Sequence, residues 1–209
     1  MTSRTWAWIR LGCAASSFPV FAVAVIILGS VTPGYSQWSD PVSRLASPGE
    51  PWAPGARAVF AIYGVVIIAS AGSLRNCGQR HGHWVSLVLA LYGLACVVAG
   101  IAPKNQPGTP PTLASQVHVT AAVLAGALLV GAMVLISRCA ATIVTRRTAT
   151  AMAALTGAAA GIFRLTWGTH LYGLSERLLL GLGMGWLSAL AASALTSARK
   201  QSQLAMDEP

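Results

Sequence analysis

Six runs of apolar residues, each close to the length that crosses a lipid bilayer, constrain this chain more than any other feature. The hydrocarbon core of a bilayer takes about 20 helical residues, and a lipid-exposed backbone must satisfy its hydrogen bonds internally. The sequence therefore predicts an all-α fold, an integral membrane bundle of six transmembrane helices in a single domain over residues 1–209. The expected helices cover residues 11–31, 58–74, 84–102, 117–137, 148–167 and 174–197.

Composition agrees with a bilayer-embedded chain, since 55% of the residues are hydrophobic and only 9% are charged. A soluble domain carries about 25% charged residues. The net charge of +9 does not indicate nucleic-acid binding, because the basic residues flank the apolar runs and form no concentrated basic face. The expected partners are membrane lipids and a hydrophobic small molecule, with no nucleic acid.

Basic residues also predict the orientation, because loops rich in Lys and Arg stay in the cytoplasm. The alternate loops carry only Arg44, Arg57 and Lys104. The N-terminus, the second and fourth loops and the C-terminal tail carry nine basic residues: Arg4, Arg10, Arg75, Arg80, Arg138, Arg146, Arg147, Arg199 and Lys200. We expect both termini to be cytoplasmic in a multi-pass protein of the bacterial plasma (inner) membrane.

The first apolar run has alternative interpretations. A signal peptide is one, and Leu11-Gly12-Cys13 resembles a lipoprotein box, although Arg10 stands where that box needs an apolar residue. An uncleaved helix, bent at Pro19, is favoured. The remaining cysteines, Cys77, Cys96 and Cys139, have no spacing that indicates a disulfide framework or a metal site, so no metal and no cofactor are expected.

Small residues recur every four positions in the last two expected helices. They are Gly157 and Gly161 in the fifth helix, and Gly181, Gly185, Ala189 and Ser193 in the sixth. Small residues let helix backbones approach closely within a membrane. Packing inside the bundle is the favoured reading, and a homodimer interface is the alternative.

The unusual polar residues gather on the predicted outer side. Loop 32–57 contains five prolines and three glycines, which predicts a structured cap. Asp40 in this loop and Glu176 at the start of the sixth helix are the candidate proton donors, and His118 is the candidate proton relay. A carboxylic acid in a partly dry site has a raised pKa and can act as a general acid.

Arg164 is expected about 9 Å below the outer end of its helix, six residues before His170. A charge at that depth normally has a partner inside the bundle, and Glu176 is the nearest candidate. The residues leave open an ion pair that pins two helices, a clamp for an anion or substrate, and snorkelling to the interface.

Further residues on the same side would bind substrate. The candidate set is Arg164, Arg177, His170, Trp38, Trp167 and Tyr172, in which the aromatic rings could also stabilise a cationic intermediate. His118 and His170 bound adjacent helices on one side, so hydrogen-bonded interfacial roles, proton transfer and ligation of a haem iron are all open.

Several short motifs resemble those of one family. Pro33-Gly34-Tyr35-Ser36, then Asp40, Ser43, Leu45, Gly49 and Pro51 resemble the outer-loop signature of the bacterial and archaeal "domain of unknown function 998" membrane proteins. Gly100-Ile101-Ala102-Pro103, His118 and Gly173-Leu174-Ser175-Glu176-Arg177 with Trp186 also resemble that family's pattern. The resemblance implies a six-helix membrane fold and, by the family's name, no particular reaction.

Two departures from the family pattern fall in the outer cluster. The family usually shows an acid where this chain has Arg44, and another just after the Gly-x-x-Pro turn, where Lys104 and Asn105 stand. If the family shares an activity, the resemblance implies that this chain has lost or changed it.

Two functions follow from these residues. The first is a membrane enzyme that binds a lipid or isoprenoid in an outward-facing polar pocket and acts by protonation, for example in terpenoid cyclisation. The second is a small carrier or an assembly partner of another membrane complex, which the small-residue pattern and the lack of a complete catalytic motif favour. The sequence leaves enzyme and non-enzyme open.

Overall fold

The computed structural model describes residues 3–75, 81–106 and 108–207, and within these ranges the fold is all-α. The helices are α1 (Ser3–Val31), η1 (Val42–Ala46), α2 (Ala53–Leu74), α3 (Gly82–Ile101), α4 (Leu113–Cys139), α5 (Ile143–Leu165) and α6 (Tyr172–Asp207). The short η1 is a 3-10 helix, and the six α-helices are each long and apolar enough to cross a membrane. This confirms the predicted six-helix membrane fold. Cys77 and Arg80 lie outside the described residues.

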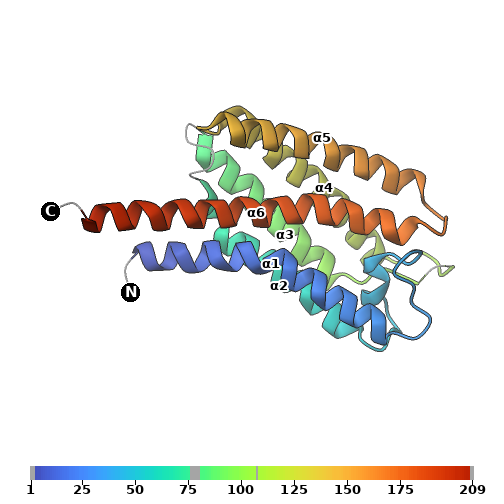
Figure 1. Cartoon of the computed structure of the whole chain (residues 1–209). Helices are drawn as coiled ribbons and strands as arrows, with labels where there is room; N and C mark the ends of the chain where they lie inside the picture. Colours follow the sequence, from blue (N-terminus) through green and yellow to red (C-terminus); the bar gives the residue numbers. More distant parts are fainter. Residues whose placement is uncertain (1–2, 76–80, 107, 208–209) are drawn as a thin grey trace.

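The six long helices form a closed ring in chain order. Each packs against the next, and α6 packs back against α1. Figure 1 shows α1 and α6 side by side. Helices that follow one another run in opposite directions, so both termini lie at one end of the bundle. Here that end is called the terminal end, and the opposite end, where residues 32–52 fold over the helices, is called the cap end.

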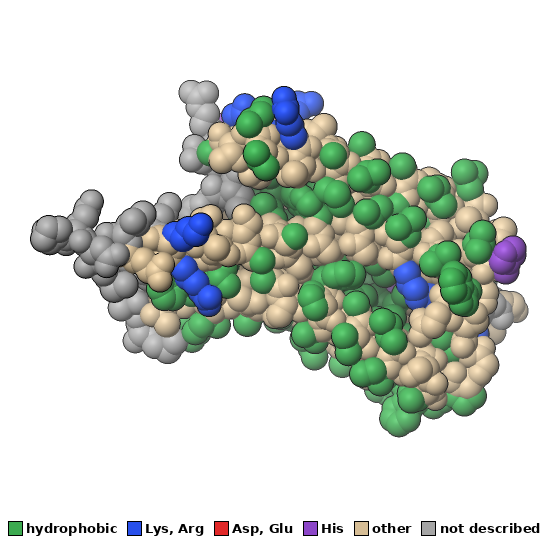
Figure 2. Space-filling view, in the orientation of Figure 1, with side chains coloured by type: hydrophobic (Ala, Val, Ile, Leu, Met, Phe, Trp, Pro, Cys, Tyr) green, Lys and Arg blue, Asp and Glu red, His purple; other side chains and the backbone are tan. Residues whose placement is uncertain are grey.

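Basic residues divide unequally between these ends. Figure 2 shows hydrophobic side chains along the bundle and Lys and Arg side chains toward its ends. The helices that meet at the terminal end contribute Arg10, Arg75, Arg138, Arg146, Arg147, Arg199 and Lys200. By the positive-inside rule, the end of a membrane protein with more Lys and Arg residues faces the cytoplasm. The cytoplasmic location of the terminal end stays a prediction.

Each helix begins before its predicted apolar run, and several of these starts have local caps. Pro54 lies in the first turn of α2, where its fixed φ suits a helix start and its missing N–H costs nothing. Thr142 precedes α5, and its hydroxyl accepts a hydrogen bond from the Thr145 N–H. Thr112 caps α4 in the same way. In α1, Pro19 lies within the helix, which changes direction about halfway along its length (Figure 1).

The closest helix contact joins α2 and α3 through glycines. A Cβ on Gly93 would lie 2.6 Å from the carbonyl oxygen of Gly64, and a Cβ on Gly100 would lie 2.8 Å from the Ala61 nitrogen. At these points the two backbones touch, and no side chain fits between them. The Tyr63 and Tyr92 hydroxyls share a buried hydrogen bond of 3.0 Å in the same interface.

Of the four small residues that recur along α6, Gly181 and Gly185 face α1, and Ala189 and Ser193 are exposed. Cβ atoms on Gly181 and Gly185 would lie 3.9 and 3.3 Å from the Phe18 ring of α1. The Ser188 hydroxyl of α6 donates to the carbonyl oxygen of Ala14 on α1, at 3.1 Å. On α5, Gly157 and Gly161 are exposed. The homodimer stays a prediction.

Candidate functional site

Residues 32–52, the cap loop, form a folded cap rather than a linker. Its η1 segment packs into the bundle, with Val42 and Leu45 each only 1% exposed. Gly34 and Gly49 have φ values of 67° and 91°, the left-handed region that glycine adopts without steric cost. The cap loop therefore brings its polar residues to fixed positions above α1, α2 and α6.

Arg177 of α6 holds the cap loop in place. Its guanidinium donates to the Gln37 side chain at 3.0 Å, to the Asp40 carbonyl oxygen at 3.0 Å and to the Tyr35 hydroxyl. It also donates to the carbonyl oxygen of Gly173, one turn earlier in its own helix. Four hydrogen bonds use nearly all of the donors that an arginine has.

A second arginine stabilises the cap loop from within. Arg44 forms ion pairs with Asp40 at 2.6 Å and with Glu50 at 3.2 Å. The hydrogen bond that Arg44 donates to the Asp40 carboxylate raises the pKa of Arg44. Burial raises the pKa of Tyr35 to about 12, against the opposing charge of Arg177. We call this group the cap lock, and it consists of Tyr35, Gln37, Asp40, Arg44, Glu50 and Arg177.

A separate group of residues surrounds the Lys104 side chain, just beyond the end of α3. Its ammonium donates to the Ser43 hydroxyl at 3.4 Å and lies 5.6 Å from the centre of the Trp167 ring and 5.9 Å from that of Tyr172. Aromatic faces attract a cation through their quadrupole. Burial lowers the pKa of Lys104, and the Glu176 carboxylate opposes that change. The ammonium thus lies in a partly dry, aromatic setting.

Glu176 shares this setting. Its carboxylate accepts a hydrogen bond from the backbone N–H of Val42, the first residue of η1. Tyr172 lies one turn earlier on α6, stacks on Phe163 at a centroid distance of 4.7 Å and meets Trp167 edge-on at 5.1 Å. The acid therefore lies beside an aromatic wall that α5 and α6 build together.

His118, in the first turns of α4, completes the group. It is 4% exposed, and its Nδ1 lies 2.8 Å from the Ala99 carbonyl oxygen and 2.9 Å from that of Ala102. Since a carbonyl oxygen can only accept, Nδ1 carries the proton and the neutral ring keeps its lone pair on Nε2. His118 is also close enough to Lys104 for their charges to interact. We call Ser43, Lys104, His118, Trp167, Tyr172 and Glu176 the lysine cluster.

The lysine cluster can be tested through the pH dependence of stability. Because folding lowers the pKa of Lys104 below its ordinary 10.5, unfolding takes up a proton in the interval between the two values. The contribution of Lys104 to the stability of the protein, and with it the unfolding midpoint, should therefore rise with pH across that interval. Thermal unfolding in detergent from neutral pH to pH 10 should show this slope, and Lys104→Met should remove it. An identical slope in Lys104→Met would contradict a partly desolvated ammonium at Lys104.

The other predicted substrate-binding residues lie outside both groups. Arg164, His170 and Trp38 are exposed, and the Arg164 guanidinium lies 6.0 Å from the centre of the Trp167 ring. Within residues 3–75, 81–106 and 108–207 no ion pair joins Arg164 to Glu176, so the ion-pair alternative for Arg164 is wrong. The physical reason is that the Glu176 carboxylate turns toward the cap loop, and Arg164 rests against an aromatic ring at the surface.

The structure thus divides the predicted residues. Glu176, His118, Trp167 and Tyr172 each lie near Lys104, and Asp40 and Arg177 belong to the cap lock. The sequence analysis missed Lys104 and Ser43 as members of the site. The available signal was a lysine directly after Gly100-Ile101-Ala102-Pro103, at a position where the family resemblance leads one to expect an acid.

Metal ligation has no obvious location in the described part of the chain, where no three His, Cys, Asp or Glu side chains gather. His118 and His170, the candidate haem ligands, differ in setting, since the first is buried and the second is exposed. The chemistry that the lysine cluster offers is proton transfer by an amine, a carboxyl group and an imidazole.

Comparison with known proteins gives a family for this chain. No curated protein and no solved structure matches it. Residues 15–193, which include all six membrane-spanning helices in whole or in part, match the family described as "Protein of unknown function (DUF998)". This confirms the resemblance that the cap-loop and α6 motifs carry. The chain is a polytopic membrane protein that belongs to the DUF998 family.

Proposed function

We propose that this protein is a membrane enzyme that binds a hydrophobic lipid or isoprenoid at the cap end and acts on it by proton transfer. The observation that supports the proposal is the lysine cluster. There a half-buried amine lies beside two aromatic rings and within electrostatic range of a carboxyl group and an imidazole from other parts of the chain. Groups whose environments change their proton affinity are typical of catalytic sites.

The aromatic rings suit a substrate that becomes positively charged. Trp167 and Tyr172 already face a cation, the Lys104 ammonium, at 5.6 and 5.9 Å. The same ring faces would stabilise a carbocation formed when an acid protonates an isoprenoid double bond, as in terpenoid cyclisation. In this proposal protonated Glu176 gives its proton to the double bond, and the carboxylate that remains takes a proton back from the cyclised carbocation. His118 and Lys104 exchange protons with Glu176.

The proposal assigns a supporting role to residues that the sequence placed in the chemistry or substrate binding. Asp40 pairs with Arg44, and Arg177 is occupied by four hydrogen bonds, so both hold the cap loop over the lysine cluster. A substrate would meet Glu176 only if η1 keeps its position. Substitutions in the cap lock should therefore lower the stability of the protein and leave the turnover of each folded molecule unchanged.

Membranes that contain the protein, incubated with a series of prenyl and other lipid substrates, test the proposal. Glu176→Gln and Lys104→Met should each lower turnover by about 100-fold or more, the usual size of a general acid–base contribution. Asp40→Asn should lower the unfolding midpoint and keep turnover per folded molecule. Gln116→Ala, an exposed position on α4 two residues before His118, is the matched control.

Two outcomes would contradict the proposal. Turnover unchanged in Glu176→Gln would remove the assigned proton donor. No turnover with any substrate, together with a stoichiometric partner after purification in mild detergent, would favour the assembly-partner alternative.

A further inference from the structure

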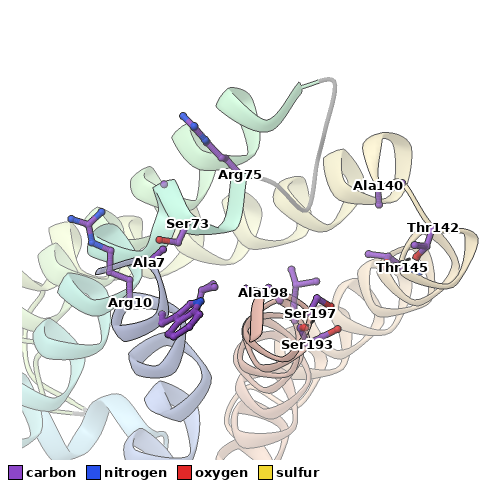
Figure 3. Close-up of a pocket in the computed structure, with 16 residues that line it drawn as sticks. Ala7, Arg10, Ser73, Arg75, Ala140, Thr142, Thr145, Ser193, Ser197 and Ala198 are labelled. Carbon is purple, nitrogen blue, oxygen red and sulfur yellow. Dashed lines mark hydrogen bonds between the residues drawn. The ribbon is translucent and has the colours of Figure 1, made fainter. Parts of the chain in front are cut away.

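A pocket of about 830 Å³ lies at the terminal end, opposite the lysine cluster. It lies between the N-terminal part of α1, the end of α2, the turn from α4 to α5, and residues 190–198 of α6, as Figure 3 shows. Its volume falls within the range of small-molecule sites in proteins. No step of the proposed proton transfer uses it.

The lining of this pocket is amphipathic. Leu11, Trp8 and Leu190 supply apolar surface, and Ser73, Thr145 and Ser193 supply hydroxyl groups. Arg10 and Arg75 also line it, and in Figure 3 their side chains extend away from its middle along the α1 and α2 edge. The interior of the pocket is therefore lined by apolar and hydroxyl groups, and the guanidinium groups of Arg10 and Arg75 lie at its rim.

A third arginine lies on the opposite edge. The Arg146 side chain donates to the carbonyl oxygen of Ala140, a lining residue, at 2.7 Å. Positive charge therefore borders the pocket on the α1–α2 side and on the α4–α5 side. Guanidinium groups bind phosphate through paired hydrogen bonds as well as through charge.

Acidic residues are remote from this pocket. Three of the chain's five acids, Asp40, Glu50 and Glu176, lie at the cap end. Asp207 is ten residues beyond the lining residue Ser197 on α6, about 15 Å further along the helix, and Glu208 follows it. Within the described part of the chain the rim arginines therefore form no ion pair with an acid, and their charge is left for a ligand.

The level of the pocket in the membrane indicates the source of that ligand. Trp6 and Trp84 are about half exposed at the terminal end, and tryptophan rings favour the headgroup region of a bilayer. A phospholipid would place its phosphate among the rim arginines and the first part of its acyl chains against Leu11 and Leu190. A free inorganic anion would leave the apolar part of the lining unused.

We propose that this pocket binds the headgroup of an anionic phospholipid from the leaflet at the terminal end. The inference does not depend on the proposed function, because the two sites share no residue. Lipid binding can be measured in the absence of turnover, so either proposal can fail alone.

The test compares phosphatidylglycerol with phosphatidylcholine of the same acyl chains, added to the full chain purified in a neutral detergent. Native mass spectrometry and thermal shift should show that phosphatidylglycerol binds more tightly, by about tenfold or more. The triple variant Arg10→Gln, Arg75→Gln and Arg146→Gln should lose that preference. The control Arg138→Gln, Arg147→Gln and Arg199→Gln removes the same charge from the same end and should keep it.

A second variant blocks the pocket and leaves every charge in place. A Cβ on the lining residue Gly72 meets nothing within 4 Å, so Gly72→Phe is expected to fold and to project its ring beside the pocket. It should weaken phosphatidylglycerol binding as strongly as the triple arginine variant does.

Three results would overturn the proposal. Equal binding of the two lipids would show that the pocket does not select an anion. Equal losses in the two triple variants would show diffuse attraction to the terminal end. Competition by millimolar inorganic phosphate would identify a free anion as the occupant in place of the lipid.

Discussion

Gly93→Ala is expected to lower the free energy of unfolding by about 3 kcal/mol, because overpacking a close backbone contact forces the helices apart. The new methyl group would lie 2.6 Å from the Gly64 carbonyl oxygen and 3.1 Å from the Ile68 nitrogen. Neither atom belongs to a side chain that could rotate away. Because α2 and α3 each contact a further helix of the ring, the displacement would pass to α1 and α4.

The matched control is Gly131→Ala on α4. A Cβ there meets nothing within 4 Å, and alanine favours a helix more than glycine does, so this variant should be neutral or slightly stabilising. Thermal unfolding of both variants in one detergent measures the difference. If Gly93→Ala unfolds at the wild-type temperature, α2 and α3 do not touch through their backbones as described.

Arg177→Gln is expected to lower the free energy of unfolding by about 3 kcal/mol, the upper part of the range for hydrogen bonds to a charged group. The substitution removes the guanidinium that joins Gln37, Tyr35 and the Asp40 carbonyl oxygen to α6. The Tyr35 and Asp40 oxygens would then need new donors. The cap loop should also become sensitive to limited proteolysis, because its attachment to α6 is weakened.

Arg164→Gln is the control for charge removal at the cap end. Arg164 is exposed near the end of α5, and replacing it should change stability by no more than about 0.5 kcal/mol. Arg177→Gln with wild-type stability and wild-type resistance to protease would show that other contacts, such as Leu174 N–H to the Trp38 carbonyl oxygen, hold the cap loop.

The sequence predicted the elements of the fold and only part of the candidate site. A helix that crosses a membrane can be predicted from one run of residues. Each run has to be long enough and apolar enough to cross the bilayer, and it satisfies its backbone hydrogen bonds internally. Pairing among polar residues is different. Arg164 and Arg177 both lie near the cap end of a helix, and nothing in their local sequence shows which one meets the cap loop.

The cap loop decides that choice. Its fold places Gln37, Tyr35 and the Asp40 carbonyl oxygen against Arg177, and it turns the Val42 N–H toward Glu176. The Arg164–Glu176 pair was a reasonable expectation from helix depth alone. It failed because a backbone donor from residue 42, far away in the sequence, already satisfies the carboxylate.

By itself, the sequence determined that six helices cross a membrane and that basic residues concentrate at one end, since hydropathy and charge act on each segment separately. Only the tertiary structure decided that Lys104 lies against Trp167 and Tyr172, within electrostatic range of Glu176 and His118, and that Arg10, Arg75 and Arg146 border one pocket. The reason is physical: contacts between residues far apart in the chain depend on how helices and loops pack, which no local pattern contains.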